Sequence, residues 1–434
     1  EAIFGANDID GILPVSIDKK YKEGISIVIK KRNVLSFVHP VNFGIDMNKF
    51  KKIDSLINDA IQNNMTPGAQ LLVAKNSNIV YHKAYGYKTY EKKEKISNNN
   101  IYDLASLTKI LVSVPLLLNE FMTNDFDLTT KLSDWFPDKE LKNKKDLTVK
   151  QMFSHYSGMK SWIPFYKKTI DSVTKTRINE YYSYKKSVKF PFQVSDDLYI
   201  RNYNDTIFNE IINSELSDSL SYVYSDLPYF LLKFYLEKKY QSSLDAQIKK
   251  YLYDKIGSTS LTYKPTNFLD NKLIVPTVLD DYFRFDLVEG HVHDMGAAMM
   301  GGISGHAGLF GNSLDIAKIL QLFLQKGSYA NEKYFDEKFF DLFNFRHFEE
   351  KKVRRGIGFD KPELDPDDPN TCGCVSYKSF GHYGFTGSVA WVDPETEIIY
   401  VFLSNRTYPD ETNNSISDYN IRTEIQKLVH EAFD

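Results

Sequence analysis

The sequence predicts an α+β fold, in which an antiparallel sheet built from both ends of the chain is flanked by helices. Strand-like runs at 69–75 and 79–85 are joined by a short polar turn, which is the pattern of a β-hairpin. Two further strand-like runs, 388–392 and 398–403, lie near the end of the chain. The stretch between them, about 104–330, is mainly helical in pattern, and we expect it to form an inserted subdomain.

The first helix is expected over 47–61, just before the hairpin. Its apolar residues recur at spacings of three and four, as a single buried helix face requires: Phe50, Ile53, Ile57 and Ile61. A longer apolar helix is expected directly after Ser106, and a last helix over 418–433. This order of elements implies a sheet that both chain ends share, with the helices of the middle packed on it.

The helical middle starts with short helices and loops over 129–165. It continues into a polar stretch, 166–220, which we interpret as an insertion beside a cleft. Further helices are expected over 227–239 and 244–256. Gly257 stands where a helix end favours glycine, and so should close the second of them.

A glycine-rich segment over 296–311 precedes another helix with clear end signals. Ser313 is expected to cap its first turn, because a hydroxyl can accept one of the free N–H groups there. Gly327 is expected to stop it.

Residues 363–376 are acidic and rich in proline, which predicts a surface loop. The two cysteines of the chain, Cys372 and Cys374, lie in this loop with one glycine between them. We expect two free thiols, because a disulfide across a single residue would be strained. Two ligands are also too few for a zinc site.

The composition is that of a globular protein with a substantial core: 434 residues, of which 42% are hydrophobic and 26% charged. A net charge of −3 predicts no general affinity for nucleic acid. No apolar run is long enough to cross a bilayer, so no transmembrane segment is expected. The chain begins at Glu1 without a leader-like segment, which is compatible with a processed or truncated product.

The first chemical signal is the pair Ser106 and Lys109, spaced S-x-x-K. Residues at i and i+3 lie on one face of a helix, so the lysine could accept the serine proton. Free N–H groups and the helix dipole at that helix start favour nearby negative charge. Alone, this motif is weak, because it also occurs at ordinary helix starts; here a hairpin precedes it and an apolar helix follows it.

Two further short motifs follow in the chain. Tyr224 opens the first, Tyr-Ser-Asp, and a phenol beside an ammonium group can relay protons. The second is His382-Tyr383-Gly384, just before a predicted strand, where glycine allows backbone N–H groups to approach a substrate carbonyl. Each motif alone is uninformative; their order and spacing carry the argument.

In that order the three motifs resemble those of serine β-lactamases, DD-peptidases and related esterases, and most closely the class C-like branch, which uses Tyr in the second motif. The resemblance extends to other segments: Thr66-Pro67-Gly68-Ala69, LTVKQMFSHYSG at 147–158, YSDLPYFLL and LSNRTYP. It covers about residues 46–434. It implies a β-lactamase/transpeptidase-like fold and a serine hydrolase that needs no cofactor.

The resemblance also implies roles for single residues. Ser106 would be the acylated nucleophile, and Lys109 would hold or accept its proton. Tyr224 would be the general base for acylation, for the deacylating water, or for both. His382 would polarise Tyr224 or bind a substrate carboxylate. The backbone N–H groups of Ser106 and Phe385 would form the oxyanion hole.

Three residues depart from the family pattern at positions expected to contact substrate together with Gly384. Asp226 stands where Asn is usual and adds a negative charge that could repel a substrate carboxylate. His382 replaces a common lysine, so a positive charge there would depend on pH. Tyr383 replaces a small Thr or Ser. All three weaken the case for an efficient β-lactamase, and none alters the Ser–Lys–Tyr set.

A narrower resemblance concerns GHVHDMGAAMMGGISGHAGLFG, which is similar to a segment of certain envelope-associated serine hydrolases. Some of these are fused behind a glycoside hydrolase family 3 β-N-acetylglucosaminidase, and IFGANDIDGILPVSI resembles the end of such a glycosidase. We therefore expect a tail over 1–45, with strand-like runs at 2–5 and 11–17, and a hydrolase domain over 46–434. An N-terminal glycosidase domain in a longer protein is the partner that this resemblance implies.

Some residues could be mistaken for metal ligands, namely His293, Asp294 and His306. Their glycine-rich context favours tight packing beside the cleft, and we predict no metal site. His155 is likewise expected to be a structural hydrogen-bonding residue. The P-loop, the HExxH motif and the G-x-S-x-G elbow are all absent from the sequence.

The sequence thus predicts a serine acyl-transfer hydrolase acting on peptidoglycan peptides, β-lactams or esters. Two alternatives remain open: an esterase for small esters, and a muropeptide-binding module without turnover. The presence of Ser106, Lys109 and Tyr224 together argues against the second alternative. A periplasmic or cell-envelope location is inferred from the family alone.

Overall fold

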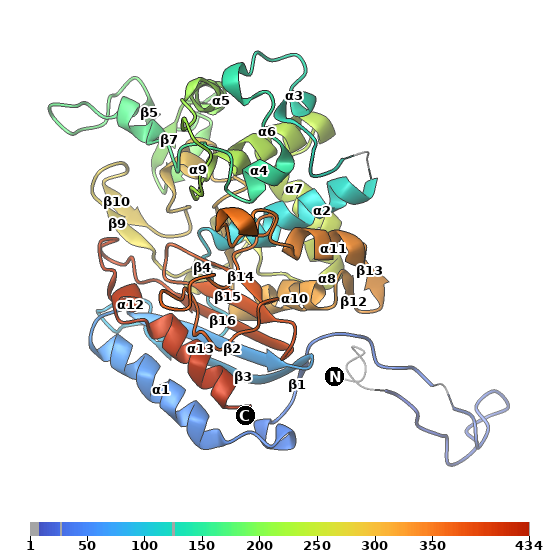
Figure 1. Ribbon diagram of the computed structural model, residues 1–434. Helices are drawn as coiled ribbons and strands as arrows, with labels where there is room; N and C mark the ends of the chain where they lie inside the picture. Colours follow the sequence, from blue (N-terminus) through green and yellow to red (C-terminus); the bar gives the residue numbers. More distant parts are fainter. Residues whose placement is uncertain (1–7, 27, 124–125, 434) are drawn as a thin grey trace.

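The structure, a computed structural model that describes residues 8–26, 28–123 and 126–433, confirms the α+β fold (Figure 1). At its centre is a six-stranded sheet with the order β1-β3-β2-β16-β15-β14. The strands are β1 (Ser36–Phe37), β2 (Gly68–Lys75), β3 (Asn78–Gly86), β14 (Phe380–Tyr383), β15 (Val389–Asp393) and β16 (Ile398–Ser404). All pairings are antiparallel except that of β1 with β3. The predicted hairpin and the predicted C-terminal strands are confirmed.

The two ends of the chain meet where β2 pairs with β16, in a register that places Ala69 opposite Ser404. Successive side chains of β2 point to opposite faces, and both faces are buried. Leu71 packs into the core on one face and Leu72 into the core on the other. Each such side chain contributes about 1.5–3 kcal/mol on burial. A continuous apolar strand is therefore fixed at the middle of the sheet.

Helices from the two chain ends cover one face of the sheet (Figure 1). They are α1 (Met47–Gln62), α12 (Ser415–Asp418) and α13 (Ile421–Glu431). The Asp46 side chain caps α1 by accepting the N–H of Asn48 at 2.9 Å. The predicted first helix is confirmed, and the predicted last helix is divided at Asn420, which has a φ of 54°.

Helices from the middle of the chain lie on the other side of the sheet (Figure 1), and α10 packs directly on β2, β15 and β16. They are α2 (Val114–Thr123), α3 (Leu132–Trp135), α4 (Val149–Phe153), α5 (Asn204–Asn213), α6 (Leu227–Tyr240), α7 (Leu244–Ile248), α8 (Asp254–Ile256), α9 (Met295–Met299), α10 (Ser313–Leu324) and α11 (Glu337–Asn344). Within the described ranges, none of the helices has the length and apolar character needed to cross a membrane.

Two helix ends test the sequence signals. Gly257, with a φ of 73°, follows α8 and closes the predicted 244–256 helix, which contains a π turn between α7 and α8. The predicted cap of α10 is wrong by one residue. Asn312 is the cap, because its side chain accepts the N–H of Asp315 at 3.0 Å, and Ser313 is the first helical residue.

The polar stretch 166–220 contains more regular structure than its composition indicates. It holds α5 and a small sheet of β5 (Tyr182–Ser183), β7 (Leu198–Ile200) and β6 (Phe192–Ser195). Further short strands are β4 (Tyr102–Asp103), β8 (Thr262–Tyr263), β9 (Val278–Asp280), β10 (Asp286–Val288), β11 (Leu309–Gly311), β12 (Ser328–Tyr329) and β13 (Glu332–Lys333). In Figure 1 the insertion lies at the end of the molecule farthest from α1.

The N-terminal tail runs away from the domain as an extended segment (Figure 1). The predicted run at 2–5 lies outside the described residues. The predicted run at 11–17 forms no strand, only an isolated bridge between Ile12 and Ser26. Its apolar side chains Ile12, Val15 and Ile17 are exposed because no sheet lies beside it. Nearer the domain, the tail joins the central sheet as β1. This strand lies within 1–45, the stretch that was predicted to be separate from the hydrolase domain.

The prediction of free thiols is wrong for this structure, in which Cys372 and Cys374 form a disulfide. Their Cα atoms lie 5.2 Å apart. Gly373 between them has a φ of 69°, a conformation open to glycine, and this turn brings the two side chains together. The surrounding 363–376 segment is a loop, as predicted.

Candidate active site

Ser106 lies in a tight turn between β4 and the helix that follows. The buried carboxylate of Asp103 accepts the backbone N–H groups of Ala105 (2.8 Å) and His293 (2.7 Å). Ala105 has a φ of 45°, a left-handed conformation that residues other than glycine rarely adopt. Such strain persists only where neighbouring contacts impose it. Asp103 therefore stabilises the turn that presents Ser106.

Lys109 lies three residues further on and contacts the serine directly. Its Nζ atom donates a hydrogen bond to Ser106 Oγ at 2.9 Å, as the S-x-x-K spacing predicts. The helix starts at Leu107, contains a π turn over Lys109–Ser113 and continues as α2. Single π turns within α-helices often mark functional sites. The predicted apolar helix after Ser106 is confirmed.

The surroundings of Lys109 are unusual for an ammonium group, because its side chain is fully buried. Its Nζ lies 2.7 Å from Asp226 Oδ1 and 3.4 Å from the His306 carbonyl oxygen. The rings of Tyr224 and Tyr229 lie 5.0 and 5.2 Å from it. A buried charge is stable only when it is paired and solvated by polar groups, and Asp226 supplies the pairing charge.

Tyr224 makes the second side-chain contact with Ser106. Its hydroxyl donates a hydrogen bond to Ser106 Oγ at 3.0 Å. Burial, together with the nearby negative charge of Asp226, raises the pKa of Tyr224 well above its ordinary value. The phenol is therefore protonated in the resting site and does not store a phenolate base.

Asp226 lies at the start of α6, where an aspartate side chain usually caps the helix. It makes no cap hydrogen bond in this structure. Its carboxylate is directed to Lys109 instead, and 21% of the side chain remains exposed. A lost cap costs roughly 1 kcal/mol, which the buried ion pair has to offset. Asp226 was predicted to contact substrate, and in this structure its carboxylate pairs with Lys109.

His382 lies on β14, on the other side of the site, and its imidazole is buried. Nδ1 donates to the Tyr383 carbonyl at 2.7 Å, which leaves Nε2 to accept from Arg355 at 3.2 Å. Desolvation and the positive charges of Arg355 and Lys109 lower the pKa of His382 to about 3. At neutral pH the imidazole carries no charge, so it offers no cation to a substrate carboxylate.

Arg355 is the site residue that sequence reasoning missed. Its guanidinium lies 5.1 Å from the centre of the Tyr224 ring and 3.2 Å from Asp360. His155, predicted as structural, accepts the Ser225 N–H at 3.0 Å, and its ring lies 4.7 Å from that of Tyr224. Arg355 carries no local sequence signal for this site, because its contacts join segments far apart in the chain. His155 lies in the family-like segment 147–158, which indicated only a structural role.

The predicted oxyanion-hole residues lie on two segments that pack together. Thr386 Oγ1 donates to the Asp103 carbonyl at 3.0 Å, and a Cβ added to Gly384 would lie 2.9 Å from the Leu104 carbonyl oxygen. Within the described ranges, no backbone partner is present for the N–H of Ser106 or of Phe385. Both donors are thus available at the junction of the two segments, as an oxyanion hole requires.

Tyr383 is not part of this group of side chains. Its neighbour His382 faces the site, and Tyr383 points to the opposite face of the strand, where its hydroxyl donates to the Asn370 carbonyl. There it borders a separate pocket with Arg422. The N–H of Gly384 donates to the Ser388 carbonyl at 2.8 Å, so it is not free to bind a substrate. Gly384 instead lets its backbone lie close to that of Leu104.

The three residues that resemble metal ligands have other partners. His306 contacts Asp294 at 2.9 Å and Ser304 at 2.8 Å, and His293 contacts Glu411 at 2.7 Å. Among the described residues, no group of three or more His, Cys, Asp or Glu side chains is placed to hold a metal ion.

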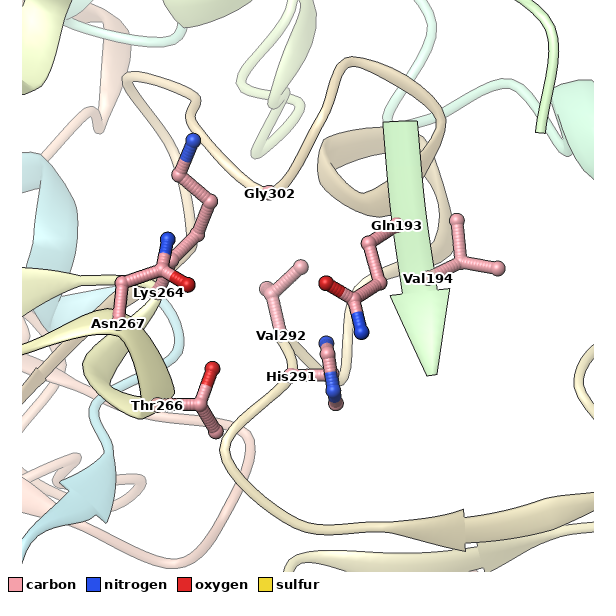
Figure 2. Close-up of a pocket in the computed structure, with 8 residues that line it drawn as sticks. All are labelled: Gln193, Val194, Lys264, Thr266, Asn267, His291, Val292 and Gly302. Carbon is pink, nitrogen blue, oxygen red and sulfur yellow. The ribbon is translucent and has the colours of Figure 1, made fainter. Parts of the chain in front are cut away.

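A polar pocket that the sequence does not predict is shown in Figure 2. Its walls are formed by Gln193, Val194, Lys264, Thr266, Asn267, His291, Val292 and Gly302. None of these residues belongs to the Ser106 group. The glycine-rich segment contributes Gly302 to this pocket and the His306 carbonyl to the Lys109 site.

The comparisons with known proteins agree with this geometry. The family model described as Beta-lactamase matches residues 53–422. The chain is 28% identical over 401 residues to the N-acetylmuramyl-L-alanine amidase of Bacillus subtilis (strain 168), a match that covers 84% of each chain. It is 26% identical over 414 residues to a protein of Salmonella agona (strain SL483) provisionally named D-alanyl-D-alanine carboxypeptidase, covering 88% of this chain and 89% of that one.

Among solved structures, EstCE1, described as a hydrolase with promiscuous acyltransferase activity, has the same fold with a TM-score of 0.62. The two are 16% identical, and the match covers 88% of this chain and 98% of that one. The predicted resemblance of residues 1–45 to a glycosidase is not supported by these relatives and stays a prediction, as do the boundaries of the two predicted domains.

Proposed function

This chain belongs to the β-lactamase family and is a serine acyl-transfer hydrolase, and on that premise we propose that Ser106 is the nucleophile that forms the acyl-enzyme. The observation that carries the proposal is the convergence of two donors on one oxygen. Lys109 Nζ and the Tyr224 hydroxyl lie 2.9 and 3.0 Å from Ser106 Oγ. Three polar groups from two distant segments meet there, and a binding module without turnover would not need them.

The protonated Tyr224 indicates how the serine proton leaves. We propose that the Tyr224 oxygen accepts the Ser106 proton while its own phenolic proton passes to the leaving amine or alkoxide. No phenolate accumulates in this concerted transfer, which agrees with the raised pKa of Tyr224. Lys109, paired with Asp226, stabilises the negative charge that develops on Oγ. In deacylation a water molecule would attack the acyl group and give its proton to the Tyr224 oxygen, and the phenolic proton would return to Ser106 Oγ.

The site also suggests how the substrate carbonyl is held. The N–H groups of Ser106 and Phe385 would bind the oxyanion, because both are free within the described residues and lie at packed segments. His382 would act through Arg355 and the β14 backbone, since its neutral ring cannot bind a carboxylate by charge.

The substrate class we propose is a cell-wall peptide, cleaved at an amide bond. The support is that relatives over most of the chain are named as an N-acetylmuramyl-L-alanine amidase and, provisionally, a D-alanyl-D-alanine carboxypeptidase. β-Lactams and simple esters would react as smaller acyl donors. A cell-envelope location follows from the same proposal.

The experiment is intact-protein mass spectrometry after incubation with a fluorescent penicillin, beside a Ser106→Ala control. An adduct on the wild type alone would support the acylating serine, and its lifetime would separate a penicillin-binding protein from a β-lactamase. If neither penicillin nor p-nitrophenyl acetate acylates the wild type, the non-catalytic binding module becomes the better reading.

A further inference from the structure

A small pocket adjoins the ion pair of Lys109 and Asp226. Its walls include four aromatic side chains and two carboxylates: Trp162, Phe165, Tyr166, Phe230, Asp226 and Asp294. Because Asp226 also contacts Lys109, which contacts Ser106, the pocket is two contacts away from the nucleophile. A group bound there can belong to the molecule that reacts with Ser106.

Each of the two carboxylates keeps one oxygen unused. Asp226 contacts Lys109 through Oδ1. Asp294 uses its own Oδ1 to accept the Ala297 N–H at 2.7 Å and to contact His306 at 2.9 Å. Within the described part of the chain, neither Oδ2 atom has a hydrogen-bond or ion-pair partner. The pocket wall contains no lysine or arginine, and its one histidine, His306, contacts Asp294 through Oδ1 and not through Oδ2.

The aromatic walls combine core side chains with one exposed side chain. Phe165 and Phe230 are only 3% exposed, and the Phe230 ring stacks on His306 at 4.2 Å. Trp162, by contrast, is 52% exposed, although it is the largest apolar side chain of the group. Aromatic faces attract cations, and tryptophan does so most strongly. Carboxylate oxygens beside aromatic faces match the chemistry of an ammonium group.

We propose that this pocket binds a primary ammonium group carried by the acyl-donor substrate. The inference rests on the proposed function, because it assumes that the substrate acylates Ser106. The unused oxygens of Asp226 and Asp294 would accept its N–H groups, and Trp162 would cover its alkyl stem and charge. The added aspartate of the second motif then has a substrate role in addition to its pairing with Lys109.

The test compares p-nitrophenyl esters whose amine is either free and charged or acetylated and neutral. One pair is the 6-aminohexanoate ester and its 6-acetamido analogue, with the ammonium at the chain end. The other pair is the ester of D-alanine and that of N-acetyl-D-alanine, with the ammonium beside the carbonyl. We expect kcat/KM to favour the charged member of one pair by about tenfold, and the pair concerned shows which position reaches the pocket.

Two variants locate the effect. Asp294→Asn keeps an oxygen for the Ala297 N–H and removes the charge, and Trp162→Ala removes an exposed side chain that the core does not need. Each should reduce the preference for the charged ester to about threefold or less. Phe268→Ala, at an apolar side chain 69% exposed elsewhere, is the matched control and should leave the preference unchanged.

The outcomes separate this inference from the proposed function. If no ester acylates Ser106, the proposed function itself is wrong. If p-nitrophenyl acetate acylates Ser106 but the charged esters react no faster than their acetylated analogues, only the ammonium pocket is overturned. A charge preference that survives both variants would also overturn it, because the selectivity would then arise elsewhere.

Discussion

The two sides of the candidate active site handle charge differently. On the α6 side, Asp226 places a negative charge directly beside the buried ammonium of Lys109. On the β14 side, His382 is neutral, and the positive charge lies behind it on Arg355, which Asp360 balances. Under the proposed function, the α6 side would act on Ser106 by charge, and the β14 side would act by position and by the proposed backbone donors. Substitutions on the two sides should consequently have different signatures.

The largest effect is expected on the α6 side at Lys109. Lys109→Met keeps the stem and removes the ammonium that contacts Ser106, and kcat/KM for p-nitrophenyl acetate should fall by about 10⁴-fold. Lys144→Met is the matched control, because Lys144 is also buried but binds backbone carbonyls of Ile212 and Ser214 away from the site. Comparable loss in both variants would mean that buried lysines affect folding rather than catalysis.

Tyr224→Phe is expected to have the next largest effect. It retains the ring against His155 and removes the hydroxyl that contacts Ser106, so turnover should fall by about 10²–10⁴-fold. Tyr229→Phe is the control, since its hydroxyl is buried without a hydrogen-bond partner near the same lysine. Steady-state kinetics of the two variants separates proton transfer from packing, and a wild-type rate in Tyr224→Phe would rule out the proposed path.

Asp226→Asn should have a smaller effect than the two preceding variants, and it should lower the free energy of unfolding as well as the rate. It leaves a buried ammonium without its counter-charge, which should cost about 1–3 kcal/mol of the free energy of unfolding in urea. Asp138→Asn breaks an exposed pair with Lys238 and should cost no more than about 0.5 kcal/mol. Equal losses would show that the Lys109 pair is solvated like a surface pair.

The last expected effect concerns the β14 side and pH. The pKa of His382 is about 3 in the folded protein and about 6.5 in the unfolded chain. Unfolding therefore takes up a proton as the pH falls below about 6.5, and His382 alone should lower the free energy of unfolding by about 2 kcal/mol between pH 7.5 and 5.0. Urea unfolding of His382→Gln should show a correspondingly smaller decrease. An unchanged decrease would place the titration elsewhere.

Local patterns in the sequence were sufficient for the elements that frame the site. The apolar spacing in α1, the turn between β2 and β3 and the apolar run after Ser106 each gave the correct element. The motifs with Ser106, Lys109 and Tyr224 were also brought together as expected. These predictions succeed because they depend on residues close in the chain or on a family pattern.

Other predictions were limited by contacts that local patterns do not contain. The Cys372–Cys374 disulfide depends on the conformation of Gly373, and the tail run at 11–17 lacks the sheet that its pattern implies. Strands inside the polar 166–220 stretch are too short for a clear alternation of side chains.

The sequence by itself determined the order of elements, the sheet shared by both chain ends and the identity of the Ser–Lys–Tyr group. The tertiary structure alone decided the partners of these side chains and the protonation of His382 and Tyr224. Asp226 faces Lys109 instead of capping α6, Arg355 keeps His382 neutral from behind, and Tyr383 points away. The physical reason is that burial and neighbouring charge set a pKa, and both arise only when distant segments of the chain are packed together.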